Sequence, residues 1–475
     1  MDLYFYNTLT KRKDLFKPIN PEEIRIYSCG PTVYKDATIG NMRTNIFQDI
    51  LRRVLRYNGY KIKHAMNITD VGHLVSDGDE GEDKMLKSAR EEHKSPIQIA
   101  EHYTKLFFDD LKSLNIETPE IVCKATDHIK EMLEYVEELI KNGYAYETST
   151  AIYFDVSKLD KYPILTNIEL ENQKAGARVN VDPEKRNPYD FALWIKAPEN
   201  HLMKWNSPWG PSYPGWHIEC SAMGQKYLGD QFDIHTGGID LIPTHHENEI
   251  AQSKGKCEKI PANYWLHGEY LLINGGKMSK SLGNVYLLKD IKEKGYDPLV
   301  YKIFSYSCHY RNKLNFTWEG IDAASKSLER LRNSYQKNLN GTDELPEEDK
   351  QKLVQIEENF HKAINDDLNM PLAMSFVWEV ARFEKKNPEV ANLLAKFDTV
   401  LGIKIDEISS QKEDIPQEIL DLVEQRKIAR ENKNWAKSDK LRDLIAEKGY
   451  TVKDTKNGME LSKVSKGTPF FDMLQ

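Results

Sequence analysis

The N-terminal third of the chain alternates between strand-like and helix-like segments, and this alternation restricts the possible folds more than any other feature. The stretch 24–29 is short, apolar and rich in β-branched residues, and it runs into a Gly-Pro turn signal. Apolar residues then recur at helical spacing over 44–58, and a second strand-like segment covers 62–68. Helical patterns follow at about 84–114 and 127–142. This order predicts an α/β fold built on a parallel sheet, whose binding site lies at the carboxyl ends of the strands.

The later parts of the sequence indicate further domains. At 475 residues the chain is too long for one hydrophobic core, so we expect about three or four domains. Short strand-like runs broken by proline and glycine predict an inserted domain, a long helical part predicts a bundle, and the tail combines charged helices with a strand candidate. The predicted boundaries are 1–144 and 206–256 for two halves of the parallel-sheet domain, 145–205 for the insertion, 257–320 for a loop region, 321–405 for the bundle and 406–475 for a small α/β end domain.

Composition and charge exclude several classes of protein. No apolar run approaches the roughly 20 residues that a membrane helix needs, so we expect no membrane-spanning role. The N-terminus has no signal-peptide pattern, which favours a cytoplasmic location. The formal net charge of −8 argues against a protein that coats nucleic acid with its whole surface, so any nucleic-acid contact must be local. The cysteines are few, odd in number and scattered, which favours free thiols or metal ligands over a disulfide framework.

A loop rich in lysine and serine gives the strongest single signal for chemistry. It reads KMSKS from Lys277 to Ser281 and follows the pair Gly275-Gly276. Glycines let such a loop move, and its ammonium groups can neutralise the charge that develops on a leaving pyrophosphate. A cluster of this kind, taken alone, is more often a solvated loop. The complete string, however, resembles the signature loop of class I aminoacyl-tRNA synthetases, which makes Lys277 and Lys280 candidate catalytic residues and Lys280 a candidate ATP contact.

The second signature of that family, HIGH, follows its first strand, where the imidazoles meet the ATP phosphates. The matching position in this chain reads Thr38-Ile39-Gly40-Asn41, so both histidines are absent. Gly40 can let the backbone approach the nucleotide, and the Thr38 hydroxyl and the Asn41 amide can donate hydrogen bonds to it. These three residues are therefore candidate ATP contacts. The competing interpretation is a simple strand-to-helix turn in which Asn41 or Thr44 caps the helix.

A group of cysteine, histidine and glutamate residues offers the donors that zinc prefers. His245 and Glu249 are four residues apart, which places them on one face if this segment is helical. Their spacing does not by itself bring Cys29 and Cys220 close, and a lone cysteine is usually a small buried hydrophobe. The segment from Cys29 to Tyr34, CGPTVY, resembles the one that precedes HIGH in cysteinyl-tRNA synthetases. That family binds one zinc with two cysteines, one histidine and one glutamate, and the resemblance points to these four residues as the ligands.

The same resemblance, which spans nearly the whole chain, implies a fold, a reaction and a substrate pocket. The fold is a Rossmann-like catalytic domain with an inserted domain, then an α-helical bundle and a small α/β anticodon-binding domain. The reaction joins L-cysteine to tRNA-Cys through an adenylate made from ATP, with Mg²⁺ accompanying the ATP. By motif position, Thr69, Trp216 and His235 would bind cysteine and Asp240 would hold the adenosine ribose. As alternatives, Trp216 could be part of the core and His235 a satisfied histidine at a strand end.

Zinc would serve to select the substrate. A zinc ion with an exchangeable position can bind the substrate thiol as a thiolate, and serine offers no comparable ligand. A hydrophobic pocket alone separates such near-isosteres by only about 10- to 200-fold. A metal that requires a thiolate therefore explains how selection could work without an editing domain.

The C-terminal tail supplies the expected contact with nucleic acid. Its basic helical stretch 426–443 contains one tryptophan, and basic residues beside an aromatic ring suit phosphates and unpaired bases. From composition alone the stretch reads as a solvated helix. Its resemblance to the anticodon-binding end of the family points to Arg430, Trp435, Asp439 and Asp454 as tRNA contacts.

Two other functions are kept as alternatives. A ligase that joins cysteine to a sugar amine would use the same catalytic half, but it would not need the long bundle and the basic tail. A tRNA-binding regulator without catalysis would account for the absent HIGH histidines, but not for the complete KMSKS string and the four metal ligands. The expected partners are therefore tRNA-Cys, ATP and L-cysteine, and we expect the chain to act as a monomer.

Overall fold

The chain forms two compact units, Met1–Asp406 and Glu407–Gln475. Among the residues that the structure covers, no helix is both long and apolar enough to cross a membrane. The structure is a computed structural model, and it describes residues 1–71, 84–166, 182–199, 201–279, 282–407, 416–432, 434–455 and 458–463.

A five-stranded parallel sheet forms the centre of the first unit. In spatial order its strands are β12 (Ala262–Gly268), β11 (Phe232–Gly238), β3 (Ile24–Ser28), β4 (Ile62–Ile68) and β5 (Ile121–Lys124). All four pairings are parallel, which confirms the predicted α/β fold.

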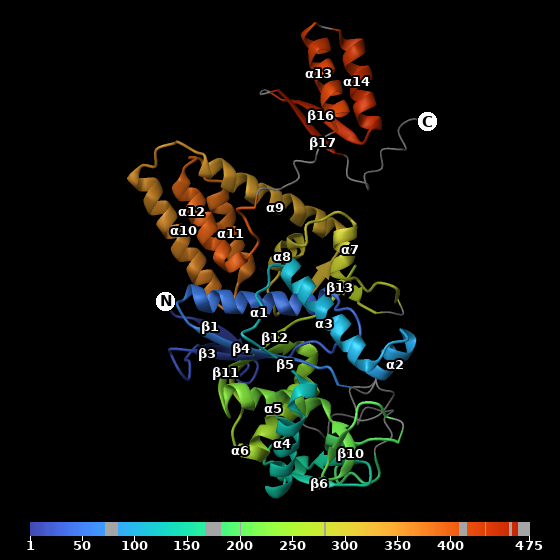
Figure 1. The fold of residues 1–475 in the computed structure, drawn as a ribbon. Helices are drawn as coiled ribbons and strands as arrows, with labels where there is room; N and C mark the ends of the chain where they lie inside the picture. Colours follow the sequence, from blue (N-terminus) through green and yellow to red (C-terminus); the bar gives the residue numbers. More distant parts are fainter. Residues whose placement is uncertain are drawn as a thin grey trace. The chain divides into compact units, whose positions relative to one another are not determined.

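Helices cover both faces of this sheet (Figure 1). They are α1 (Ile39–Tyr57) and α3 (Pro96–Ser113) on one side, and α4 (Ile129–Lys141), α5 (Trp216–Leu228) and α6 (Glu247–Cys257) on the other. The short helix α2 (Lys84–Glu91) packs against α3. The N-terminal hairpin of β1 (Tyr4–Asn7) and β2 (Arg12–Leu15) adjoins β12. The carboxyl ends of the central strands are thereby left for the loops that carry the candidate residues.

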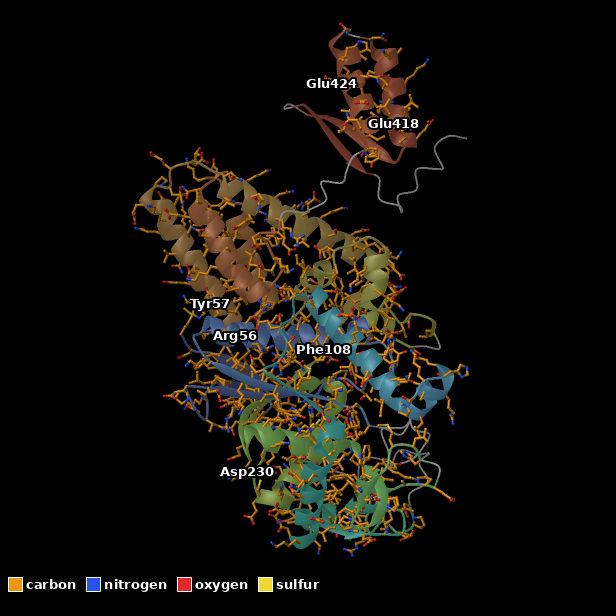
Figure 2. All side chains as sticks on the ribbon, in the orientation of Figure 1. Arg56, Tyr57, Phe108, Asp230, Glu418 and Glu424 are labelled. Atoms are coloured by element: carbon orange, nitrogen blue, oxygen red, sulfur yellow. The ribbon has the colours of Figure 1, made fainter. Side chains whose placement is uncertain are left out.

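Helix α1 is central because it packs against the sheet on one side and against the helical bundle on the other. Thr38 caps its first turn, and this cap starts the helix several residues before the apolar periodicity seen in the sequence. Ile46, Ile50 and Val54 recur at helical spacing and are buried. At the far end, Tyr57 (Figure 2) packs against the bundle.

The insertion between the two halves of the parallel sheet forms an antiparallel sheet of its own. Its strands, in spatial order, are β6 (Ala145–Glu147), β7 (Ala151–Phe154), β8 (Phe191–Lys196), β10 (Gly210–Pro214) and β9 (Trp205–Ser207). Trp194 fills its interior, and the indole nitrogen donates a hydrogen bond to Ser212 Oγ (2.6 Å).

A short three-stranded sheet leads from the parallel sheet to the bundle. It consists of β14 (Gly276–Lys277), β13 (Leu271–Ile273) and β15 (Leu314–Phe316). The helices that follow β14 are α7 (Leu288–Glu293), α8 (Leu299–Tyr306), α9 (Trp318–Leu339), α10 (Glu347–Asn365), α11 (Met370–Ala381) and α12 (Pro388–Leu401). Lys302 of α8 and Asp49 of α1, both fully buried, form an ion pair (2.7 Å) that joins the bundle side to α1.

The second unit is a small α/β domain. Its elements are α13 (Gln417–Glu431), α14 (Trp435–Glu447), β16 (Tyr450–Thr455) and β17 (Gly458–Lys463). The two strands pair in antiparallel register. Ile419, Ile445, Tyr450 and Val452 form its small apolar core.

Candidate active site and metal centre

Four side chains from separate parts of the first unit meet beside the carboxyl end of the parallel sheet. Cys29 directly follows β3, and Cys220 lies on α5. His245 lies in a single π-helical turn before α6, and Glu249 lies in the first turns of α6. Their donor atoms all lie within 4.8 Å of one another. The structure thus brings together the four residues that the family resemblance singled out.

The spacing of these donors fits a tetrahedral zinc ion. The sulfur atoms of Cys29 and Cys220 are 3.8 Å apart, Cys220 Sγ lies 3.4 Å from His245 Nε2, and His245 Nε2 lies 3.1 Å from Glu249 Oε1. Zinc–sulfur bonds of about 2.3 Å at the tetrahedral angle separate two sulfurs by about 3.8 Å. Because zinc bonds to nitrogen and oxygen are shorter, donor pairs that include them should be somewhat closer. The pairs Cys220–His245 and His245–Glu249 are closer, whereas Cys29 Sγ and Glu249 Oε1 are 3.8 Å apart.

The charges of the group also suit a bound cation. Burial raises the pKa of the Cys29 thiol well above its usual value. Burial raises the pKa of Cys220 too, but hydrogen bonds with Cys29 and His245 bring it down to about 7. Desolvation likewise raises the pKa of Glu249, but the imidazoles of His235 and His245 bring it down to about 2. The lowered pKa values of Cys220 and Glu249 therefore favour negative charge in a buried space, where protons or a metal ion must balance it.

Further histidines lie directly beside these donors. His235 of β11 places Nε2 2.8 Å from Glu249 Oε2. His246 Nε2 lies 3.4 Å from Cys29 Sγ, and His246 Nδ1 lies 2.7 Å from His267 Nε2 of β12. Cys29, His235, His246 and Glu249 make a second group whose atoms could hold a metal ion. Sequence reasoning missed His246, for which the pair His245-His246 before Glu249 was a signal. It also missed His267, for which no local pattern was a signal.

The close packing of the histidines around the donors requires a glycine at position 237. A Cβ atom added at Gly237 would lie 2.8 Å from the His246 ring, so any larger residue would push the imidazole away. The other side of the site shows a comparable case, since a Cβ atom at Gly30 would lie 1.7 Å from the carbonyl oxygen of Asn67. Both glycines therefore let neighbouring strands and loops close around the donors.

Two more residues predicted to bind cysteine reach this region. Trp216 begins α5, and its ring centroid lies 4.3 Å from that of His245. Thr69 follows β4 and donates a hydrogen bond from Oγ1 to Glu219 Oε2 of α5 (2.8 Å). Asp240, predicted to hold the adenosine ribose, lies in the 3₁₀ turn directly after β11. Thr69 and Asp240 lie at the carboxyl ends of central strands, where an α/β sheet binds its ligand.

At the HIGH position, the polar side chains bond to each other. Thr38 Oγ1 donates to Asn41 Oδ1 (2.8 Å), and the Asn41 backbone nitrogen donates to Thr38 Oγ1 (3.3 Å). The Thr38 backbone nitrogen also donates to Asn41 Oδ1 (2.9 Å). These contacts form a capping box in which Thr38 is the N-cap, so the expectation of Asn41 or Thr44 as the cap was wrong. The Thr38 hydroxyl proton is directed at Asn41, and Gly40 lies between them in the first turn.

In the described part of the KMSKS loop, Lys277 is exposed and Met278 and Ser279 are half-buried. The side-chain amide of Asn284 holds the base of the loop. Lys277 ends β14. Asn284 accepts a hydrogen bond from the Ser279 backbone nitrogen (2.8 Å) and donates one to the Lys277 carbonyl oxygen (3.1 Å). Sequence reasoning did not identify Asn284 as the residue that closes this loop. Lys280 and Ser281 lie outside the described residues.

In the second unit, the candidate tRNA contacts lie mostly on α13 and α14. The Arg430 guanidinium lies 5.4 Å from the Trp435 ring centroid, and 56% of Trp435 is exposed. Asp439 pairs with Arg442 one turn later (3.2 Å). Asp454 lies on β16, but its side chain is outside the described part of the structure. The structure thus brings an exposed indole and a cation together.

Two protein-family models match the chain over most of its length. The model for the catalytic domain of class I (C) tRNA synthetases matches residues 15–326. The model for the cysteinyl-tRNA ligase anticodon binding domain matches residues 412–460.

Curated relatives match over nearly the whole chain. The cysteine-tRNA ligase of Treponema denticola is 46% identical over 483 residues, covering 96% of this chain and 98% of that protein. The cysteine-tRNA ligase of Thermus thermophilus is 41% identical over 477 residues, with the same coverage of 96% and 98%.

Two solved structures are similar to this chain in fold. The methionyl-tRNA synthetase of Mycobacterium tuberculosis in complex with methionyl-adenylate has a TM-score of 0.56 at 15% identity, covering 80% of this chain and 90% of that one. LeuRS of Agrobacterium radiobacter K84, in a ternary complex with tRNA and LeuAMS, has a TM-score of 0.59 at 12% identity, covering 82% and 84%. These likenesses support the predicted fold class.

Proposed function

This chain belongs to the cysteine-tRNA ligase family of class I aminoacyl-tRNA synthetases, and from that membership we propose how it selects its amino acid and performs its reaction. L-Cysteine and ATP form cysteinyl adenylate with release of pyrophosphate, and cysteine then passes to the terminal adenosine of tRNA-Cys. The chain acts as a monomer in this proposal, with Mg²⁺ accompanying the ATP.

The proposed selection of cysteine rests on the set of four donors, whose spacing is compatible with zinc. Cys29, Cys220, His245 and Glu249 would hold one zinc ion, which supplies a site for the thiolate of the substrate. Trp216 and His235 adjoin the donors and would enclose the side chain of cysteine, with Thr69 near its amino-acid end. Serine lacks a comparable ligand, so the discrimination would exceed the roughly 10- to 200-fold that shape alone provides.

Neither chemical step requires a nucleophile from the protein. In the first, a carboxylate oxygen of cysteine attacks the α-phosphorus of ATP and the bond to pyrophosphate breaks. In the second, a ribose hydroxyl of tRNA attacks the acyl carbon and AMP leaves. The chain therefore acts by positioning and by charge stabilisation. The first turn of α1, with Gly40 and Asn41, and Asp240 would bind ATP, while Lys277 and Lys280 would stabilise charge on the pyrophosphate.

The second unit would provide the contact with tRNA. The Trp435 ring is exposed and is flanked by the Arg430 guanidinium, an arrangement that suits stacking on an unpaired base beside a phosphate. Asp439 and Asp454 would add hydrogen-bond acceptors for base edges. The match of residues 412–460 to an anticodon binding domain also disfavours a ligase acting on a sugar amine, which needs no such domain.

The proposal is tested by cysteine-dependent exchange of ATP and pyrophosphate with the purified full chain. We expect exchange with cysteine, little with serine, loss of exchange after zinc is removed by a chelator, and charging of tRNA-Cys. Exchange that persists undiminished in metal-free protein would overturn the role of zinc. Exchange without any charging of tRNA-Cys would favour the sugar-amine ligase, and tRNA binding without exchange would favour the non-catalytic regulator.

A further inference from the structure

Arg43 lies on α1, two residues after Asn41 of the HIGH position, and its side chain is almost completely buried. Its guanidinium donates four hydrogen bonds, all to main-chain carbonyl oxygens. Nη1 donates to Glu269 (2.6 Å) and Tyr270 (2.8 Å). Nη2 donates to His309 (3.3 Å) and Asn312 (2.5 Å). No carboxylate of a described residue forms an ion pair with Arg43, so its hydrogen bonds meet carbonyl dipoles rather than a charged partner.

The four carbonyls belong to two segments that are far apart in sequence. Glu269 and Tyr270 link β12 to β13, and β13 continues through a hairpin into the KMSKS loop. His309 and Asn312 lie in the loop between α8 and β15, and β15 pairs with β13 in parallel. One side chain of α1 therefore holds both the link from β12 to β13 and the loop from α8 to β15. These segments lead into the small sheet from which the KMSKS loop extends.

The first turn of α1 also touches this sheet directly. A Cβ atom added at Gly40 would lie 3.8 Å from Met278 Cε and 3.9 Å from Leu271 Cβ, so the helix start and the hairpin are already in close contact. The Ile39 backbone nitrogen donates to the Tyr286 carbonyl oxygen (3.0 Å), and Thr38 forms an isolated antiparallel bridge with Leu287. A shift of α1 against the hairpin would therefore change the distance between the two ATP-binding motifs.

We infer that Arg43 is a positioning residue for ATP, which sets the placement of the first turn of α1 relative to the KMSKS hairpin. This inference rests on the proposed function, because it assumes that ATP binds between those two elements. It assigns Arg43 no contact with substrate. Its four carbonyl bonds cannot be replaced by lysine, because an ammonium group is a compact point donor and cannot span two chain segments as the planar guanidinium does.

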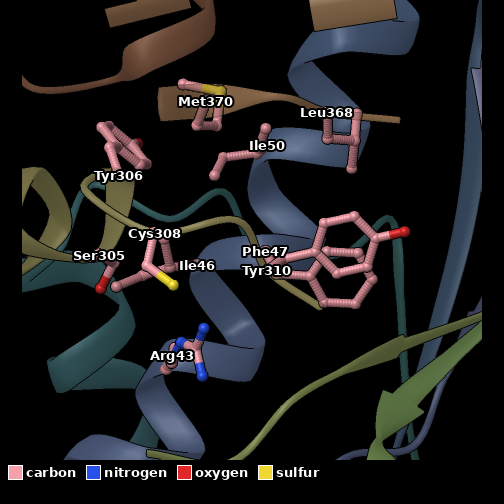
Figure 3. Close-up of a pocket in the computed structure, with 10 residues that line it drawn as sticks. All are labelled: Arg43, Ile46, Phe47, Ile50, Ser305, Tyr306, Cys308, Tyr310, Leu368 and Met370. Atoms are coloured by element: carbon pink, nitrogen blue, oxygen red, sulfur yellow. The ribbon is translucent and has the colours of Figure 1, made fainter. Parts of the chain in front are cut away.

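A pocket beside Arg43 provides a route to test the role of the guanidinium itself. Figure 3 shows Arg43 at one end of this pocket, with Ile46, Phe47 and Cys308 among the lining residues. An alanine at position 43 would extend the space, and a small guanidinium ion could then occupy the place of the lost side chain. Methylguanidinium should restore activity to such a variant, whereas methylammonium at equal concentration should not.

The experiment measures ATP–pyrophosphate exchange by zinc-loaded full chains carrying Arg43→Lys or Arg43→Ala. Because a misplacement of about 1 Å can cost on the order of 100-fold, we expect kcat/KM for ATP to fall about 100-fold in Arg43→Ala and about 10-fold in Arg43→Lys. The KM for cysteine and the zinc content should stay within about twofold of wild type. Rescue of Arg43→Ala by methylguanidinium would support the inference.

The matched control is Arg52→Ala on the same helix. Arg52 is also buried and donates to two carbonyl oxygens, those of Glu117 (2.6 Å) and Thr118 (3.3 Å), away from the hairpin. Unlike Arg43, it also pairs with a carboxylate, that of Glu120 (2.7 Å). We expect it to lower the thermal unfolding midpoint without changing the KM for ATP. An unchanged ATP dependence in both Arg43 variants, or an equal ATP effect in Arg52→Ala, would overturn the inference. Failure of the proposed function would be recognised separately, because wild type would then show no cysteine-dependent exchange.

Discussion

Replacing Cys220 with serine should weaken zinc binding far more than replacing any cysteine outside the four-donor group. Cys220 supplies one of four donors, and its sulfur lies 3.8 Å from Cys29 Sγ and 3.4 Å from His245 Nε2. Structural zinc sites of four ligands bind with about 10–16 kcal/mol, or about 2.5–4 kcal/mol per ligand if the contributions are equal. The loss of one thiolate should therefore reduce zinc affinity about 60- to 700-fold.

Competition against a chromophoric zinc chelator measures this affinity directly. The matched control is Cys123→Ser, because Cys123 is equally buried but lies outside the four-donor group, and its thiol donates a hydrogen bond to the Met66 carbonyl oxygen (3.5 Å). We expect Cys123→Ser to bind zinc within about threefold of wild type and to retain cysteine-dependent exchange. If Cys220→Ser kept wild-type zinc affinity, or if both variants lost zinc equally, the assignment of the four ligands would be refuted.

Three further predictions concern other parts of the chain. Lys280→Ala should slow ATP–pyrophosphate exchange on the order of 100-fold with little change in the KM for cysteine, and an unchanged rate would show that the KMSKS loop is not catalytic here. Trp435→Ala should weaken charging of tRNA-Cys by about 1–3 kcal/mol, or roughly 5- to 140-fold, while exchange without tRNA stays normal; equal charging by both proteins would contradict base stacking. Burial, together with the charges of Arg52 and Arg56, lowers the pKa of His64 well below 6.5. The folded state therefore binds fewer protons at His64 than the unfolded state does. Folding stability should fall as the pH drops below about 6.5. Between pH 7.5 and 5.5 wild type should lose about 1.4 kcal/mol more unfolding free energy than His64→Gln, and parallel losses would refute this.

The sequence predicted the order of the central elements well because their signals are local. Strands β3 and β4 occupy almost the same residues as the two strand-like segments found in the sequence. The meeting of Cys29 with Cys220 could not be derived in this way. It depends on the pairing of β3 with β11, where Ile26 lies opposite Ile234, and on the packing of α5 against β3. Family resemblance supplied that link, whereas spacing along the chain contains no information about it.

Side-chain partners inside the site were the least predictable feature. From the sequence, Asn41 could be either a donor to a nucleotide or a helix cap, and only the structure shows that Thr38 is the cap and bonds to Asn41. The partners of Arg43 are carbonyl oxygens 226 to 269 residues away, and carbonyls carry no residue-type signal. His267 likewise joins the histidines near Glu249 only because β12 lies beside β11 in the sheet. These contacts are consequences of tertiary pairing and cannot be read from local patterns.

The central claim is that the metal held by Cys29, Cys220, His245 and Glu249 binds the thiolate of the substrate. X-ray absorption at the zinc edge counts the sulfur atoms around the ion, because zinc–sulfur bonds of about 2.3 Å are resolved from shorter bonds to nitrogen and oxygen. We predict two sulfurs in the free protein, three after addition of cysteine, and two after addition of serine. A count that stays at two with saturating cysteine would contradict the account.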